Sequence, residues 1–174
     1  PDMQAYIQSQ LENPPSTISL PNNLFLLATM NSSDQAVKPM DTAFKRRWSF
    51  EYIQIDYNKA TPGLIQVPLR NGTISIEWSV FAEKINNRLK SLQIPEDRLL
   101  GHRFLSDSEL ASPQAAMNTV CGKLFVYLWD DVLRHGRRDI IFNSTQFGTF
   151  GELIKGYKNN IPVFCEELDE DLGS

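Results

Sequence analysis

The chain has 174 residues, a length that suits one ordinary domain or two small ones. It is 41% hydrophobic and 22% charged, an ordinary globular composition with enough apolar mass to bury a core. The net charge of −4 excludes a globally basic nucleic-acid binder, so any such role would require a local basic patch.

Membrane-spanning and disulfide-stabilised proteins are also excluded. No apolar run reaches the roughly 18 residues that a transmembrane helix requires, and we expect neither a membrane association nor a signal peptide. The two cysteines, Cys121 and Cys165, are expected to be free thiols in a reducing, cytoplasmic compartment.

The N-terminal third begins with a predicted short helix over residues 3–11 and a proline-rich loop. The apolar run that follows, from Leu24 to Met30, has no polar alternation. Such a run predicts a strand buried on both faces of a mostly parallel sheet. The short polar residues 31–34 come directly after it, at the strand end where ligands bind in open α/β sheets.

A short helix is predicted over residues 42–47, with Asp41 as its N-cap and a basic triplet at its end. Residues 51–55 then alternate polar and apolar, which predicts a half-exposed edge strand. Residues 56–63 form a polar linker containing proline and glycine, and we place a domain boundary there.

The remainder of the chain predicts one hairpin and several helices. Asn71-Gly72 lies between two β-prone runs, the strongest short hairpin signal, and Pro68 makes the first arm an edge strand. Apolar residues at spacings of three and four predict an amphipathic helix over 78–92. Further helices are expected over 112–135, opened by a serine cap and a proline, and over 147–157, whereas the acidic tail 166–174 is expected to be disordered.

Two blocks in the N-terminal third resemble the AAA+ NTPases of the McrB type, the motor subunits of restriction systems that cut DNA containing modified cytosine. The first block is Ala28–Asp34 (ATMNSSD), and the second is Asp41–Trp48 (DTAFKRRW). In that family an apolar strand ends in a similar TMN segment, and a helix with a basic triplet follows. Gln35 and Trp48 depart from the family's usual Arg and Phe, without affecting the polar positions.

The resemblance implies an α+β, mainly α fold, the C-terminal fragment of an AAA+ module. Residues 1–57 would be the end of the nucleotide-binding core, and residues 58–165 a helical lid with an N-terminal β-hairpin. Residues 166–174 would be the acidic tail.

Asn31 matches the family's sensor-one residue, which would orient the attacking water without adding negative charge beside the phosphates. Asp34 would lie at the same nucleotide site. The alternative is that Asn31 and Asp34 only form a turn after a strand.

Arg46 and Arg47 match the arginine finger, a catalytic group that a neighbouring subunit supplies to the phosphates. Asp41 would cap the helix and hold the triplet in place. Two alternatives stay open: the basic residues could complement a helix C-terminus, or they could contact nucleic-acid phosphates.

His102 and Arg103, in the segment Gly101–Phe104, lie where the family has its second sensor and could approach bound phosphates. Alternatively they belong to an ordinary loop. A second basic cluster, Arg134 to Arg138, is read as a solvated helix end rather than a nucleic-acid contact.

No phosphate-binding loop of the pattern G-x-x-x-x-G-K-[ST] is present, and no acidic pair closes an apolar strand before Leu24. We therefore expect the chain alone to hold no nucleotide. The resemblance implies a longer parent that binds GTP or ATP with Mg²⁺, assembles a homo-oligomeric ring, a hexamer, and acts on DNA indirectly through a McrC-type nuclease subunit. The competing hypothesis is a stand-alone helical interaction or nucleic-acid-binding module.

Overall fold

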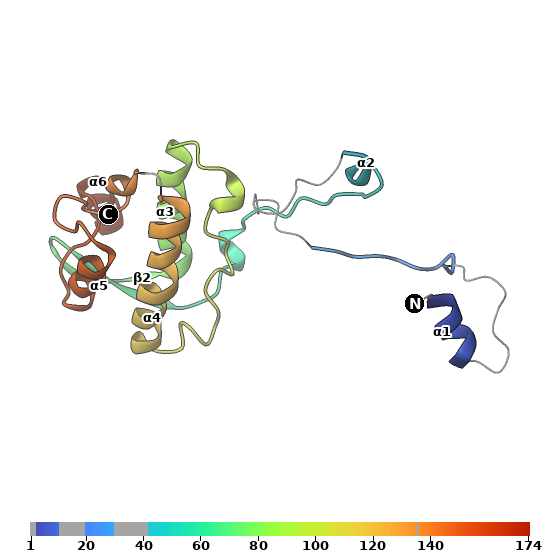
Figure 1. Cartoon of the computed structure of the whole chain (residues 1–174). Coiled ribbons are helices and arrows are strands. Elements are labelled where there is room, and N and C mark those ends of the chain that lie inside the picture. Colours follow the sequence, from blue (N-terminus) through green and yellow to red (C-terminus); the bar gives the residue numbers. More distant parts are fainter. Residues whose placement is uncertain (1–2, 11–19, 30–41, 135) are drawn as a thin grey trace. The chain divides into compact units, whose positions relative to one another are not determined.

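A computed structural model describes residues 3–10, 20–29, 42–134 and 136–174 (Figure 1). The chain divides into two compact units, residues 1–34 and 35–174. This division does not coincide with the expected boundary after residue 57, so the core and lid partition stays a prediction.

The described part of the first unit consists of helix α1 (Met3–Gln10) and an extended segment over residues 20–29. The prediction of a buried strand beginning at Leu24 is wrong for this chain by itself. Residues 24–29 form no strand, and the side chains of Phe25 and Leu27 are 86% and 97% exposed. The physical reason is that a strand needs a hydrogen-bonded neighbour, and the described residues of this unit supply none.

The first described element of the second unit is helix α2 (Thr42–Lys45). A turn over residues 46–48 follows it, then extended chain to Asp56 and the 3₁₀ turn η1 (Tyr57–Lys59). The predicted edge strand over residues 51–55 is wrong, because this segment also lacks a strand beside it in the described structure. Ile53, which the alternation placed on an apolar face, is 80% exposed.

The hairpin prediction is confirmed. Strand β1 (Leu64–Leu69) pairs antiparallel with β2 (Gly72–Glu77), and Leu69 faces Gly72 across the turn. Gly72 has a φ of +122°, which a side chain would strain.

Helix α3 (Trp78–Ser91) confirms the predicted amphipathic helix. Its buried stripe follows the expected spacing but contains one polar residue, Asn86, which is fully buried. A short 3₁₀ turn, η2 (Glu96–Arg98), then lies in the connection to the next helix.

A long helical segment runs from Pro113 to Val132, as predicted. It begins as helix α4 (Pro113–Thr119), capped by the Ser112 hydroxyl, which accepts a hydrogen bond from the Ala115 N–H at 3.2 Å. It continues through two π-helical stretches, η3 (Val120–Leu124) and η4 (Tyr127–Val132).

The last third adds the 3₁₀ turn η5 (Arg138–Ile140) and helix α5 (Phe150–Lys158). Helix α5 starts with a reciprocal cap between Thr149 and Glu152. Phe142 and Phe164 join the loops on either side of α5 through an isolated antiparallel bridge.

The acidic tail is folded, which corrects the prediction of disorder. Residues Glu166–Gly173 form helix α6, whose carboxylates in the first turn complement the helix dipole. Leu168 and Leu172, four residues apart, are buried, and α6 contacts α3 and β1. Asp169, only 4% exposed, accepts two 3.2 Å bonds from the backbone N–H of Arg70 in the hairpin.

The core of the second unit is rich in aromatic rings. Phe125 makes edge contacts with Phe142, Tyr157 and Phe164 at centroid distances of 5.0–5.9 Å. Hairpin, α3, the long helical segment, α5 and α6 all contribute to this one core.

Candidate functional site

Three of the predicted site residues, Asn31, Asp34 and Asp41, lie outside the described residues. The sensor and cap roles assigned to them therefore stay predictions. The structure bears on the remaining four, which are the two arginines after α2 and the pair at residues 102 and 103.

Arg46 and Arg47 lie in the turn that closes α2, where their backbone N–H groups donate to Thr42 and Phe44 at 3.2 and 3.0 Å. Both side chains are exposed. The rings of Phe44 and Trp48 pack at 5.7 Å between centroids. This ring contact braces the turn from which the two guanidinium groups project, so they are available to a partner or ligand.

His102 is held by bonds from other segments of the chain. Its Nδ1 accepts from the backbone N–H of Asp56 at 3.3 Å. Its carbonyl accepts from the Thr61 N–H at 3.1 Å and from the indole N–H of Trp78 at 3.3 Å. His102, in the loop after η2, is therefore bonded to the segment that contains Asp56 and Thr61 and to Trp78 at the start of α3. Arg103 beside it is exposed.

The four predicted residues that the structure describes lie in two separate places, the turn after α2 and the loop after η2. Over the described ranges, no hydrogen bond or ion pair joins His102 or Arg103 to Arg46 or Arg47. In the second basic cluster Arg138 lies over the Trp129 ring at 4.2 Å and donates to the Trp129 carbonyl at 3.3 Å. That arginine packs on its own fold, whereas Arg134 and Arg137 of the same cluster are exposed.

Asn86 is a structural residue that the sequence reading missed. Its amide nitrogen donates to the Tyr57 hydroxyl and to the Leu100 carbonyl, and its oxygen accepts from the Leu100 N–H, each at 2.8 Å. One side chain thus fastens η1 and the loop before His102 to α3. The sequence feature that indicates its burial is its spacing, four residues after Ala82 and one after Ile85, inside the apolar stripe of α3.

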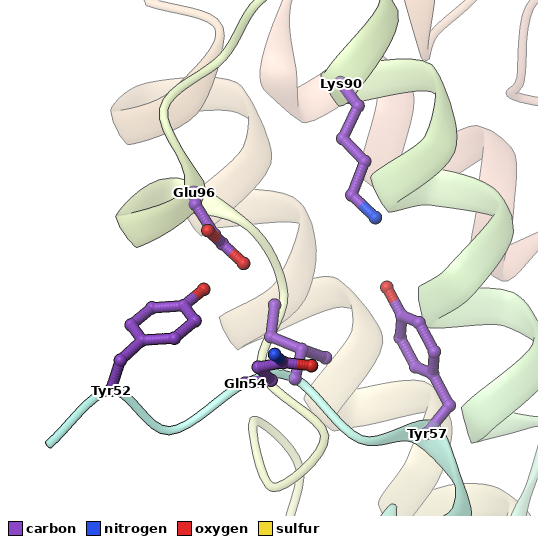
Figure 2. Close-up of a pocket in the computed structure, with 6 residues that line it drawn as sticks. Tyr52, Gln54, Tyr57, Lys90 and Glu96 are labelled. Atoms are coloured by element: carbon purple, nitrogen blue, oxygen red, sulfur yellow. The ribbon is translucent and has the colours of Figure 1, made fainter.

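A hollow of about 370 Å³ lies between the extended segment before η1, the end of α3 and η2 (Figure 2). Figure 2 shows the Tyr52 hydroxyl turned toward the Glu96 carboxylate, with Lys90 and Tyr57 on the other side. The pKa of Tyr52 is raised, chiefly by its hydrogen bond with Glu96 and to a smaller extent by desolvation and by the negative charge of that carboxylate. The walls carry both charges and none of the predicted site residues, so the hollow is separate from the expected nucleotide chemistry.

The described residues offer no metal centre, since no group of three or more His, Cys, Asp or Glu side chains gathers among them. None of the described helices is long and apolar enough to span a bilayer.

Burial raises the pKa of both cysteine thiols, which favours structural roles for them.

Comparison with known proteins supplies one relationship. Over 155 residues the chain is 41% identical to a protein of Bacillus subtilis (strain 168), the component YdiS of the type II restriction enzyme BsuMI. The chain is related to a restriction-enzyme component. The aligned part covers 88% of the chain but 43% of that relative, so the chain spans less than half of its length. No family model matches the chain, and neither does any solved structure.

Proposed function

We propose that the chain is part of the NTP-hydrolysing motor of a restriction system, the C-terminal portion of an AAA+ NTPase of the McrB type. The observation that carries the restriction assignment is the 41% identity with a restriction-enzyme component. The NTPase assignment is supported by the two blocks around Asn31 and Arg46, in the order and at the spacing found in that family.

The exposed apolar segment of the first unit supports a role within a larger fold. Leu26 and Leu27 are adjacent and point to opposite faces of extended chain, yet they are 65% and 97% exposed. A run that is apolar on both faces is typical of a strand covered by helices on both sides. The remaining part of an AAA+ core would provide that cover.

The proposed roles follow from phosphoryl-transfer chemistry. Asn31 would orient the water that attacks the γ-phosphate of GTP or ATP, whose Mg²⁺ and phosphates are held elsewhere in the parent. Arg46 or Arg47 would meet the charge that develops on the equatorial oxygens at the neighbouring subunit's nucleotide. Hydrolysis in a homo-oligomeric ring would then drive DNA translocation with a McrC-type nuclease.

The test uses the full-length parent and steady-state hydrolysis of GTP and of ATP. Arg46→Ala and Arg47→Ala are each assayed, with Arg137→Ala as the matched control because Arg137 is an exposed arginine at another helix end. Loss of the finger should lower turnover by about 10³-fold or more. Full turnover in both arginine variants would overturn the assignment.

A mixing experiment tests delivery between subunits. Asn31→Ala subunits and Arg46→Ala subunits, each inactive alone, are combined in one ring. Some interfaces then pair an intact Asn31 with an intact Arg46, so activity should return. If mixed rings stay inactive while size-exclusion chromatography shows that they assemble, the arginine does not act in trans.

A second candidate function rests on the exposed basic triplet at the end of α2. Lys45, Arg46 and Arg47 are exposed beside the Phe44–Trp48 ring pair, and cations next to aromatic rings are typical of single-stranded nucleic-acid sites. Binding of the 174-residue chain to single-stranded DNA, falling steeply as salt rises, would favour this function.

A further inference from the structure

Residues 56–61 are bonded at several points to the helical body, by which we mean the hairpin and helices of the second unit. The first of these bonds along the chain is at His102. The Thr61 hydroxyl donates to the Leu105 carbonyl at 2.5 Å, and the Tyr57 hydroxyl accepts from Asn86. Before Asp56, residues 49–55 make no backbone hydrogen bond to the body in the described structure. The bond from the Asp56 N–H to His102 Nδ1 is thus the first backbone tie that the extended segment meets.

The Asp56 carboxylate takes no part in this tie. Its Oδ1 accepts from the Asn58 N–H at 3.1 Å, capping η1, and its Oδ2 pairs with Lys59 at 3.3 Å. The imidazole therefore meets only the main chain of Asp56, and the bond survives any change of that side chain that leaves the turn intact.

The direction of this bond fixes the state of the imidazole. A backbone N–H can only donate, so Nδ1 must be the acceptor and the ring proton must be on Nε2. A charged imidazolium carries a proton on both nitrogens and would lose the bond. With this bond in place, Nδ1 carries no proton and Nε2 carries one.

We propose that His102 is a positioning residue, a clamp that fixes where the segment leading from the Arg46–Arg47 turn enters the helical body. In this role Nδ1 acts on the protein's own main chain, whereas the resemblance implied an approach of His102 or Arg103 to bound phosphates. The clamp itself does not depend on the proposed function; only its effect on nucleotide turnover does.

A matched pair of variants separates the two nitrogens. In His102→Asn the side-chain oxygen can take the place of Nδ1 and accept from the Asp56 N–H. In His102→Gln the amide reaches the place of Nε2, so the acceptor at Nδ1 is lost. Amide hydrogen exchange of the whole chain, followed by NMR, reports the bond at Asp56. The Thr61 amide is the internal control, because it bonds to the His102 carbonyl, which every variant retains.

The glutamine variant should speed exchange at Asp56 by about tenfold or more, whereas the asparagine variant stays close to wild type. Exchange at Thr61 should be unchanged in both. If glutamine leaves Asp56 protected, or if both variants release it equally, the clamp is refuted.

The wild-type chain gives a result that can refute the clamp even if the glutamine variant does not fold. The ¹⁵N chemical shifts of the His102 ring at neutral pH should show a neutral ring with its proton on Nε2. A proton on Nδ1, or a doubly protonated ring, would overturn the proposal.

In the full-length parent, turnover distinguishes a clamp from a phosphate contact. A clamp predicts that asparagine preserves kcat and glutamine lowers it, with KM for the nucleotide little changed. A phosphate contact predicts that both variants raise KM. The arginine variants test the proposed function separately, so either proposal can fail alone.

Discussion

Replacing Asn86 with leucine should destabilise the second unit by about 3 kcal/mol, although leucine has a similar size and greater helix propensity. Asn86 is fully buried and makes three 2.8 Å hydrogen bonds. Two of them serve the N–H and C=O of Leu100, a residue that is itself 0% exposed. The substitution therefore leaves two buried main-chain groups without partners.

The magnitude follows from those two groups. Each buried polar group without a partner costs about 1–3 kcal/mol, which gives about 2–6 kcal/mol for the pair at Leu100. The lost bond to the Tyr57 hydroxyl adds about 1 kcal/mol, and burying the leucine side chain returns about 1.5–3 kcal/mol. A net loss near 3 kcal/mol is a large share of the roughly 5–15 kcal/mol that stabilises a domain.

Urea unfolding measures the loss directly, as a midpoint lowered by about 1 M or more at an unchanged slope. Asn87→Leu is the matched control, the same chemical change at the next position, where the side chain is exposed; it should stay within about 0.5 kcal/mol of wild type. Tyr57→Phe removes one bond and should cost about 1 kcal/mol. An Asn86→Leu midpoint equal to that of Asn87→Leu would refute the reasoning.

Three further outcomes are expected. Gly63→Ala should lower the free energy of unfolding by about 2 kcal/mol and with it the thermal midpoint, because φ is +150° and the new Cβ would lie 2.7 Å from Leu110 Cβ. An unchanged midpoint would mean that the loop relaxes freely. Asp169→Ala should cost about 1–3 kcal/mol in urea unfolding by leaving the Arg70 N–H without its carboxylate, and Asp169→Asn should cost less because one acceptor remains. Burial raises the pKa of both cysteine thiols above the ordinary value, so little thiolate forms at pH 8. A disulfide-exchange reagent should therefore label the folded chain far more slowly than the unfolded chain, and equal labelling rates would contradict this.

Local patterns predicted the elements whose determinants lie close together in the sequence. Asn71-Gly72 fixes the hairpin by its own turn chemistry, and Ser112-Pro113 opens the long helical segment by capping and φ preference. Helix α6 was missed because its charge suggested disorder. Its stability depends on Leu168, Leu172 and Asp169 meeting α3 and the hairpin, contacts that no local window contains.

The candidate site divides in the same way. The exposure of Arg46 and Arg47 agrees with a short basic helix end, which the sequence predicts from adjacent residues. The tie between His102 and Asp56 spans 46 positions, and the role of Asn86 depends on Leu100 folding back onto α3. Hydrogen bonds of this kind are set by tertiary placement, so the sequence could indicate a polar residue at each position but not its partner.

The contact between α6 and the hairpin also bears on how the protein is made. The Asp169 carboxylate bonds to a backbone group 99 positions earlier. During translation the hairpin and α3 leave the ribosome long before α6 exists, and pairing of distant positions is slow because a large loop must close first. Nascent chains should therefore recruit chaperones at the uncovered β1 surface, and ribosome stalling before α6 has emerged should yield products that cellular proteases remove quickly.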